Sequence, residues 1–479
     1  MPAVRWPIDP RPGQREVAEE LASLLIEGKR VAFSAQTGWG KTMTVIAALI
    51  ETKFFPVVWL VRSLTVGKRV AEDAALWGLT TFIAGGRERT CLIKESVEDA
   101  NDYCRYYKYR CPYFRLPHYI PNVSSFVELV ERGREEKWCP YFAQDLVQTD
   151  VVVQNYFRRM KLYRTPKTLV YDEAHNLLLP RERTYKISKI AERIAVAKQL
   201  GASEKLLLAL ESLMKYMLVR DGPLDASLYL DEDRMEELRK LHVQGLEQGL
   251  SLRPLLDITS FAYIEGERVV VYAPPTLPPH RPAVFVSATL PPGSEALLST
   301  DAIVKVPWQT KPPCRIVTSV TTRYEEFDGR MALYYKKLII KIGKEHRRVL
   351  VFAPSERVAR ELRGIATFEE CEPPPNWEGV LLLRARGRYA EGVNLPADAV
   401  VIAGAPYLPP SVGEWIARQL KRAGVADPVK AALDIPMLIT TLQSVGRAWR
   451  DPKKPPHVVL ADYRFEKYSN ILAEYFTLE

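Results

Sequence analysis

The sequence predicts an α/β protein with two parallel β-sheets, and three observations support this prediction. Short, continuously apolar runs alternate with helical stretches, as where "RVAFSAQTG" is followed by "GKTMTVIAALIETK". Runs of this kind, joined by helices, are typical of parallel strands that are covered on both faces. They form two sets, one before and one after about residue 295, with "TLPPGSEALLST" at the junction. At 479 residues the chain is long enough for several domains.

The apolar runs also predict the strands and the domain boundaries. The first set is "RVAFSAQTG", "FPVVWLVRS", "KTLVYDEA" and "PAVFVSATL", and the second is "RRVLVFAPS", "GVLLLRA", "DAVVIAGAP" and "HVVLADYR". Two segments interrupt the pattern: one holds four of the six cysteines, and the other is mostly helical with amphipathic spacing. We therefore predict a first domain of residues 1–84, 141–179 and 263–295, a second domain of residues 296–479, and insertions at residues 85–140 and 180–262.

The composition is that of a globular protein with an excess of basic residues. Hydrophobic residues make up 47% and charged residues 26% of the chain, and the net charge is +9. The charge favours a polyanionic partner, although many basic proteins have none. An apolar leader and a run of eighteen apolar residues are both missing, so we expect a cytoplasmic protein without a membrane span. Seven Asn, eleven Gln and 36 Pro point weakly to a thermophile, in which intracellular disulfides also occur.

The sharpest motif is "AQTGWGKT", residues 35–42, which lies between a predicted strand and a predicted helix. A phosphate-binding loop requires this context. Gly38 and Gly40 would let backbone N–H groups close around phosphate oxygens at the helix N-terminus. Lys41 would reach the β- and γ-phosphates of ATP, and Thr42 would bind Mg²⁺. A chance glycine-rich turn is the alternative interpretation.

The stretch "LVYDEAH", residues 169–175, places an acidic pair at the end of a predicted buried strand. Asp172 would hold Mg²⁺, usually through water, and Glu173 would polarise the water that attacks ATP. His175 would link this loop to movements elsewhere. Taken alone, the stretch could also be the acidic first turn of a helix. The phosphate-loop motif upstream favours the catalytic interpretation.

A third stretch, "SATL", follows directly after a predicted strand. The hydroxyl groups of Ser287 and Thr289 could couple a nucleotide site to a nucleic-acid site. Ser and Thr after a strand are common, however, so this motif counts only together with the others.

The fourth stretch is "QSVGRAWR", in which Gln443, Arg447 and Arg450 have the i, i+4, i+7 spacing of one helix face. The two guanidinium groups could stabilise a phosphoryl group during its transfer. Gln443 would contact ATP from the same face. The alternative is a solvated basic helix.

The order of these motifs resembles that of superfamily 2 helicases, and more narrowly that of the XPD family of iron–sulfur DNA helicases, which includes the DinG type. "CPYFAQDLVQTDVVVQNYF" resembles the stretch around the family's fourth cluster cysteine, and "RARGRYAEGVNLP" resembles its R-G-x-x-x-E-G-I-D-F-P motif. "VVIAGAPYLPP", "QSVGRAWR" and "VLADYRF" match its later motifs, and "RPGQREV" resembles its N-terminal Q-type motif. The resemblance spans nearly the whole chain. It implies two RecA-like (P-loop) domains with an inserted Fe–S cluster domain and a small helical arch-like insertion.

The same resemblance implies roles for residues outside the four motifs. Gln14, in the Q-type stretch, is placed to read adenine. Glu391 and Gly392 would couple ATP hydrolysis to movement, and Arg62, in "VRSLTV", would contact DNA.

Four cysteines of the first insertion are separated by 12, 6 and 27 residues: Cys91, Cys104, Cys111 and Cys139. The resemblance implies that they hold a [4Fe–4S] cluster, which takes four thiolate ligands. The C-x2–4-C pairs usual in zinc sites do not occur, which weighs against zinc. Disulfides and free thiols remain alternatives. Cys314 and Cys371 lie outside this group.

Aromatic and basic residues surround two of these cysteines in "CRYYKYRCPYF". Arg105, Lys108 and Arg110 could meet phosphates, and a base could stack on Tyr106 for about 1–3 kcal/mol. Alternatively, the tyrosines pack around the cluster and the charges are solvated.

These observations together predict an ATP-dependent DNA helicase that uses ATP, Mg²⁺ and a [4Fe–4S] cluster. By resemblance it would move 5′→3′ on single-stranded DNA, act as a monomer on single-stranded and forked DNA, and work in DNA repair with repair proteins. One alternative is a DNA-dependent ATPase that translocates or verifies damage without unwinding. Another is a passive nucleic-acid-binding module, against which the intact "GKT", "DEAH" and "QSVGRAWR" stretches argue.

Overall fold

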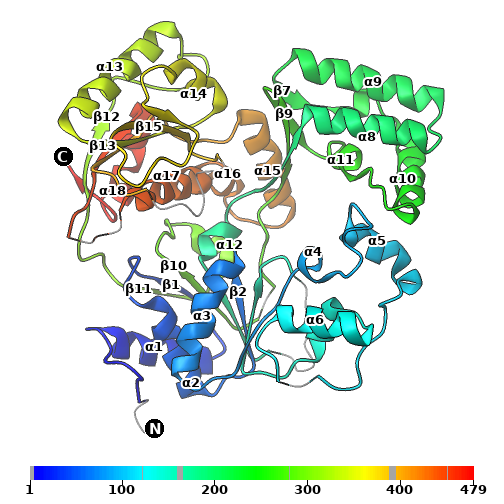
Figure 1. Cartoon of the computed structure of the whole chain (residues 1–479). Coiled ribbons are helices and arrows are strands. Elements are labelled where there is room, and N and C mark those ends of the chain that lie inside the picture. The colour runs from blue at the N-terminus through cyan, green and yellow to red at the C-terminus, as the bar shows by residue number, and fades with distance from the viewer. Residues whose placement is uncertain are drawn as a thin grey trace. The chain divides into compact units, whose positions relative to one another are not determined.

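The computed structural model describes residues 5–120, 122–158, 166–279, 281–387, 395–449, 451 and 453–479. The chain divides into two compact units, one of residues 1–288 and 298–305 and the other of residues 289–297 and 306–479. Each unit contains a parallel sheet of seven strands. Figure 1 shows the two sheets with the helices around them. This confirms the prediction of an α/β chain with two parallel sheets.

The sheet of the first unit has the strand order β11-β1-β10-β5-β2-β4-β3. Its central strands are continuously buried, because apolar residues fill both faces. The strands are β1 (Arg30–Ser34), β2 (Val57–Val61), β3 (Thr81–Ile83), β4 (Val151–Asn155), β5 (Thr168–Asp172), β10 (Ala283–Ser287) and β11 (Ala302–Lys305). Helices and turns around them are α1 (Gln14–Ile26), α2 (Lys41–Thr52), α3 (Leu64–Leu76), η2 (Gln144–Leu146) and η3 (Ala174–Leu177).

The sheet of the second unit has the order β14-β15-β13-β16-β17-β12-β18, again with parallel pairing throughout. Its strands are β12 (Pro313–Val317), β13 (Arg348–Ala353), β14 (Phe368–Glu369), β15 (Gly379–Arg384), β16 (Ala399–Ile402), β17 (His457–Ala461) and β18 (Thr477–Leu478). The helices that accompany them, including one that begins just before the unit boundary, are α12 (Ser294–Leu298), α13 (Gly329–Glu345), α14 (Glu356–Leu362), α15 (Pro410–Arg422), α16 (Pro428–Ala432), α17 (Asp434–Ala448), η6 (Tyr463–Tyr468) and α18 (Ser469–Leu472).

The helical insertion contains a sheet as well as helices. Its helices are α8 (Ile187–Gln199), α9 (Glu204–Val219), η4 (Ala226–Leu228), α10 (Glu232–Glu247) and α11 (Arg253–Asp257). An antiparallel sheet of order β6-β9-β8-β7 accompanies them, built from β6 (Arg181–Lys186), β7 (Gly222–Leu224), β8 (Ala262–Glu265) and β9 (Arg268–Ala273). The sheet therefore continues past residue 262 to Ala273. We did not predict it, because β6 is almost wholly exposed and shows no apolar run.

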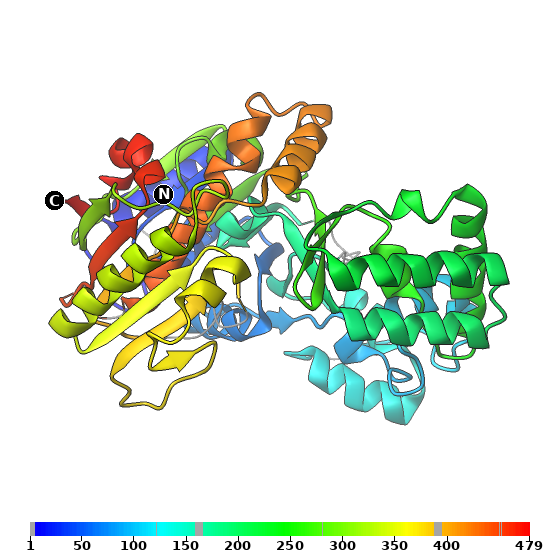
Figure 2. The same cartoon turned by 90° about the horizontal axis from the view of Figure 1, so that it is seen from above.

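The cysteine-bearing segment, residues 85–140, consists of short elements. They are α4 (Arg87–Thr90), α5 (Ala100–Tyr107), η1 (Lys108–Arg110), α6 (Phe126–Glu136) and the start of α7 (Pro140–Ala143). Figure 2 shows this segment in cyan and blue beside the green helices of the helical insertion. Among all the helices described, none has both the length and the apolar character needed to cross a membrane.

Candidate functional site

The phosphate loop lies between the end of β1 and the start of α2, and two glycines allow its turn. Gly38 and Gly40 have φ of 83° and 97°, a region that residues with a side chain rarely adopt. A Cβ on Gly40 would also lie 2.3 Å from Nε2 of Gln14. Gln14 is buried at the start of α1, and its Nε2 donates to the carbonyl oxygens of Trp39 at 3.0 Å and Gly40 at 3.3 Å. The predicted adenine-reading side chain therefore contacts the phosphate loop itself.

Lys41 and the acidic pair lie at one edge of the first sheet. Strand β10 separates β1 from β5, and all three strands run parallel, so their carboxyl ends share that edge. The Lys41 ammonium donates to the carbonyl oxygens of Ala35 at 2.9 Å and Gln36 at 3.1 Å. Burial lowers the pKa of Lys41 to about 8, while the charges of Asp172 and Glu173 oppose this shift. Thr42, the other predicted ligand of ATP·Mg²⁺, follows as the second residue of α2.

The two acidic residues differ in environment and backbone. Burial raises the pKa of Asp172, against a hydrogen bond from Trp59 Nε1 at 3.4 Å and the charge of Lys41. Glu173 is exposed and has φ of 51°, in the left-handed region. Its N–H donates to Oδ1 of Asp172 at 3.0 Å, and its carbonyl oxygen accepts from Nδ2 of Asn176 at 2.9 Å. A strained backbone of this kind tends to occur at functional sites.

The lowered pKa of Lys41 predicts how ATP affinity depends on pH. Below about pH 7 the ammonium is charged with or without ATP, so affinity is flat. Above the free-protein pKa of about 8, ATP must bind together with a proton, so affinity falls by up to about tenfold per pH unit. Calorimetry at about pH 8.5, in buffers of different ionisation enthalpy, should detect proton uptake. A Lys41→Gln variant with the same uptake would assign the proton to another group.

His175 connects the acidic loop to the "SATL" stretch. Its Nδ1 lies 2.8 Å from Oγ of Ser287, at the end of β10. Burial lowers the pKa of His175 to about 3, so the imidazole is neutral. Two residues later the chain enters the second unit, where Oγ1 of Thr289 accepts from Nε2 of Gln443 at 2.7 Å. The predicted coupling residues are thus hydrogen-bonded on both sides of the unit boundary.

The structure describes some, but not all, of the remaining residues that the sequence predicts to act on ATP or DNA. Arg62 is half-buried, and its guanidinium contacts Oδ1 of Asn176 rather than projecting from the surface. Arg447 lies in the last turn of α17, one turn after Gln443. The predicted site residues Glu391, Gly392 and Arg450 lie outside the described residues.

The four cysteines of the first insertion share one pocket. Its lining also contains aromatic rings and two cationic side chains, Arg87 and Lys108. All six cysteines of the chain are free of disulfides. Within the described part of the chain, the geometry identifies no group of three or more His, Cys, Asp or Glu residues that could hold a metal ion. The four cysteines of the pocket are Cys91, Cys104, Cys111 and Cys139.

Burial in the pocket raises the pKa of thiols that line it, so the thiolate form is disfavoured unless a positive charge lies nearby. Burial raises the pKa of Cys139 to about 11. Burial likewise raises the pKa of Cys91 and of Cys104, and neighbouring thiols add to it. The positive charge of Arg87 opposes the rise at both residues. Deprotonated thiols therefore need a cationic partner in this pocket.

The predicted DNA-binding residues around α5 have different surroundings. Arg105 and Tyr106 are exposed on α5, as nucleic-acid contacts require. Lys108 lines the cysteine pocket and lies 4.9 Å from the ring centroid of Tyr109. Arg110 forms an ion pair with Glu247 of α10. Of the three basic side chains, Arg105 is thus the one placed to meet phosphate without a competing contact among those described.

This difference predicts unequal effects on DNA binding. For single strands, log affinity falls with log salt by about 0.7 per phosphate neutralised. We expect Arg105→Ala to flatten that slope by about 0.7, because its charge is unpaired with any described carboxylate. Arg110→Ala should flatten it less, since Glu247 already neutralises that charge. Fluorescence anisotropy with a labelled oligonucleotide across a salt series measures both slopes. Equal flattening by the two variants would contradict the assignment.

Three contacts of the site were not predicted. Trp59 donates to Asp172, Asn176 donates to Glu173, and Arg87 lies 4.0 Å from the ring centroid of Tyr141 beside the cysteines. Trp59 belongs to a predicted buried strand, and nothing in that apolar run marks it as a partner of Asp172. Arg87 lies four residues before Cys91, which is the one sequence signal that could have singled it out.

Known proteins share both sequence and fold with this chain. Residues 334–477 match the family described as helicase C-terminal domain. The ATP-dependent DNA helicase XPD of Sulfolobus acidocaldarius is 24% identical, covering 94% of this chain and 96% of the relative. A solved structure of an XPD helicase has a TM-score of 0.74 at 22% identity, covering 98% of this chain and 100% of that one. The structure of Xpd4 from S. tokodaii has a TM-score of 0.62 at 20% identity, with coverage of 98% and 100%.

Proposed function

Because this chain belongs to the XPD family of helicases, we propose that it is an ATP-dependent DNA helicase that separates duplex DNA while moving along a single strand. One observation carries the proposal. At the carboxyl ends of the strands of the first sheet, the phosphate loop with Lys41 lies close to Asp172 and Glu173. The similar protein of Sulfolobus acidocaldarius is named an ATP-dependent DNA helicase. Movement in the 5′→3′ direction and a role in DNA repair are proposed from the resemblance of the motifs.

In the proposed reaction, the chain binds the phosphates of ATP and positions a water molecule. Loop N–H groups and Lys41 would hold the β- and γ-phosphates, and the hydroxyl of Thr42 with the carboxylate of Asp172 would hold Mg²⁺. Glu173 would accept a proton from the attacking water. The hydrogen bond from the backbone N–H of Glu173 to Asp172 holds the Glu173 backbone in place. It therefore fixes the point from which the Glu173 side chain projects.

Residues of the second unit would also take part in ATP hydrolysis and would respond to the state of the nucleotide. Arg447, with Arg450, would stabilise negative charge on the phosphoryl group in the transition state. The pairs His175–Ser287 and Gln443–Thr289 would pass the state of the nucleotide along the "SATL" stretch. A neutral His175 suits this role, since it can exchange hydrogen bonds without a change of charge.

We also propose that the cysteine pocket holds a [4Fe–4S] cluster. Four thiolates are the ligand set that such a cluster takes, and all four cysteines line one pocket. The cationic Arg87 and Lys108 in the lining suit an anionic thiolate-bound cluster. The aromatic walls around it would limit access of water. When bound, the cluster would cross-link four separate points of residues 85–140.

Serine substitution should therefore remove iron selectively. Cys104→Ser and Cys139→Ser should each lose most of the iron and the broad absorbance near about 400 nm in protein purified without oxygen, because a hydroxyl is a poor iron ligand. Cys371→Ser is the matched control, since this thiol lies outside the pocket lining. Iron and acid-labile sulfide in the unchanged protein should each approach about four per chain. Stoichiometric zinc without iron would exclude the cluster.

A strand-separation assay tests the proposed activity. Forked duplexes with either a 5′ or a 3′ single-stranded tail are incubated with ATP and Mg²⁺, and ATP hydrolysis is measured alongside. Separation of the 5′-tailed substrate supports the proposal, and separation of only the 3′-tailed one would reverse the polarity. DNA-stimulated hydrolysis without separation would instead favour a translocase or a damage-verifying subunit. DNA binding without hydrolysis would favour the passive module.

A further inference from the structure

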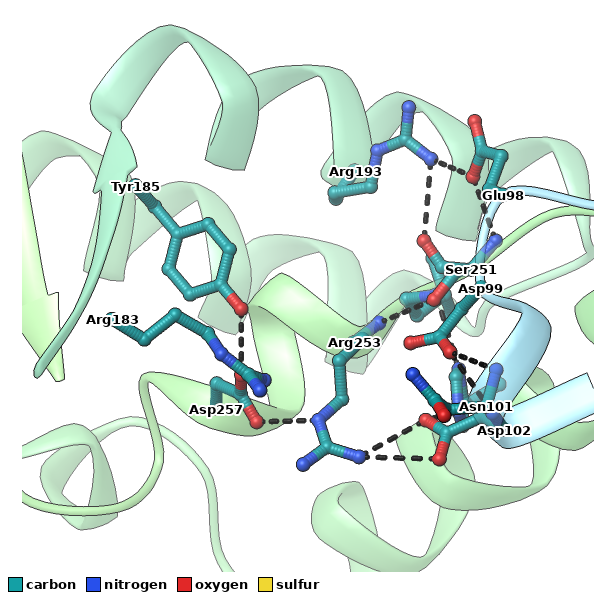
Figure 3. Close-up of polar contacts among 12 residues, drawn as sticks. Glu98, Asp99, Asn101, Asp102, Arg183, Tyr185, Arg193, Ser251, Arg253 and Asp257 are labelled. Carbon is teal, nitrogen blue, oxygen red and sulfur yellow. Dashed lines mark hydrogen bonds and ion pairs between the residues drawn. The ribbon is translucent and has the colours of Figure 1, made fainter. Parts of the chain in front are cut away.

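Two segments that lie far apart in the sequence meet through oppositely charged side chains in the first unit, as Figure 3 shows. The cysteine-bearing segment contributes carboxylates, and the helical insertion contributes basic and polar groups from α8, α10 and the start of α11. We refer to the following six residues as the docking network: Glu98, Asp102, Arg193, His242, Ser251 and Arg253.

The first half of the docking network surrounds Asp102, which is buried on α5. Its Oδ2 lies 3.1 Å from Nε2 of His242 and 3.0 Å from Nη1 of Arg253. Nδ1 of His242 accepts from the N–H of Leu252 at 3.1 Å, so a neutral imidazole donates to Asp102 through Nε2. These contacts, the His242 hydrogen bond foremost, hold the pKa of Asp102 at about 2. Asp102 is therefore a buried carboxylate, and both of its side-chain partners among the described residues, His242 and Arg253, come from the insertion.

The second half joins Glu98 to the chain just before α11. Oε2 of Glu98 accepts from the N–H of Ser251 at 2.8 Å and also contacts the guanidinium of Arg193. Arg193 is 6% exposed, and its Nη1 donates to the carbonyl oxygen of Ser251 at 3.2 Å. The N–H of Glu98 donates to the carbonyl oxygen of Gly249 at 2.8 Å. A Cβ on Gly249 would lie 2.4 Å from the carbonyl oxygen of Ser96, so the two backbones approach too closely for a side chain.

The two partners of this contact differ in what holds them in shape. The helical insertion has its own hydrophobic core and a four-stranded sheet. The described part of residues 85–140 has few buried hydrophobic side chains, which are Ala100, Val123, Leu129, Trp138 and, at its last position, Pro140. A segment with so little core needs a cross-link to stay ordered. Helix α5, at eight residues, is also too short to be stable alone.

The same short helix carries Cys104 and Asp102, so its order links the cysteine pocket to the docking network. We propose that attachment of the helical insertion is conditional on the cluster. Loss of the cluster would disorder α5, withdraw Glu98 and Asp102, and release an insertion that itself stays folded. This inference rests on the proposed function in one respect, which is that the four cysteines hold a cluster.

Thermodynamic linkage gives the converse. If the cluster favours docking, then docking must favour cluster retention by the same factor. Removing charge on the insertion side, more than fifty residues from the nearest cysteine of the pocket, should therefore speed the loss of iron. Couplings of this kind typically amount to about 5- to 150-fold in equilibrium constant.

Two adjacent amide protons report on docking in the full-length protein. The N–H of Ser251 is bonded across the contact to Glu98, whereas that of Leu252 is bonded within the insertion to His242. Hydrogen exchange with single-residue resolution is compared between iron-loaded protein and protein whose cluster has been removed by oxidation and chelation. We expect exchange at Ser251 to rise by about tenfold or more, while Leu252 and the amides of α9 stay protected.

A matched pair of variants tests the converse. In Arg193→Met with Arg253→Met, both stems are kept and both charges are lost. We expect this protein to contain iron as purified, to lose Ser251 protection, and to bleach about 5-fold or more faster under a chelator. Arg239→Met is the control, because Arg239 is an arginine of α10 whose partners among the described residues are Glu232 and Glu236 of its own helix. It should match the unchanged protein.

The outcomes separate the possible failures. Iron-free unchanged protein would overturn the proposed cofactor, and the docking inference with it. Iron-loaded protein whose Ser251 amide stays protected after cluster loss would overturn the dependence of docking on the cluster alone. Exposure of both Ser251 and Leu252 on cluster loss would show that the insertion does not fold independently. Unchanged bleaching in the double variant would remove the docking network from this role.

Discussion

Lys41→Ala should lower the rate of ATP hydrolysis by about a thousandfold or more, while affinity for single-stranded DNA stays close to that of the unchanged protein. The reason is the position of the ammonium group at the end of β1, where it now satisfies the carbonyl oxygens of Ala35 and Gln36. With ATP bound, the same three N–H donors would turn to the phosphates, where negative charge grows in the transition state. No other described lysine lies in this loop.

The measurement is steady-state ATP hydrolysis with and without single-stranded DNA, next to a DNA-binding titration. Lys205→Ala is the matched control, because Lys205 is an exposed lysine of α9, outside the parallel sheets. It should retain full hydrolysis. Hydrolysis near the normal rate in Lys41→Ala would remove this residue from the nucleotide site, and a parallel loss of DNA binding would indicate misfolding instead.

Arg447→Ala should also reduce ATP hydrolysis, by about a thousandfold, with little change in the affinity for ATP. Its guanidinium is expected to act on charge that exists only in the transition state, so kcat should fall while nucleotide binding to the first unit persists. Arg447 lies on α17, the helix that also carries Gln443. Binding is measured with a fluorescent ATP analogue and turnover by phosphate release.

Arg360→Ala on α14 provides the control for this substitution. Arg360 is an exposed arginine of the same unit, and its loss should leave both quantities unchanged. If Arg447→Ala weakened ATP binding and turnover equally, Arg447 would be a ground-state contact rather than a transition-state one.

Much of the fold could be predicted because continuous burial leaves a strong signal. All eight quoted apolar runs form parallel strands, since both faces of a central strand must be apolar. Among the strands outside these eight runs, β4 and β9 do contain consecutive valines, but several others lack this signal. Edge strand β11 is half-exposed, β14 and β18 have two residues each, and β6 is polar along most of its length. Their pairing depends on neighbours that are distant in the sequence.

The candidate site was predictable where a motif is local. The phosphate loop and the acidic pair each occupy one short stretch, and their geometry follows from a strand that ends and a helix that begins. Trp59, Asn176 and the docking network were not predictable, because each acts through a partner supplied by the tertiary fold. An aspartate such as Asp102 looks like a solvated helix residue until the insertion is seen to cover it.

The left-handed backbone at Glu173 has a consequence for any attempt to evolve or engineer this protein. A residue with a side chain is disfavoured in that conformation by about 1–2 kcal/mol, whereas glycine is at ease there and asparagine nearly so. Selection for heat resistance alone should therefore enrich Gly or Asn at this exposed position and discard the carboxylate. Stability and catalysis thus favour different residues at this position. A library screened only for thermal stability should therefore accumulate proteins that fold well but do not hydrolyse ATP.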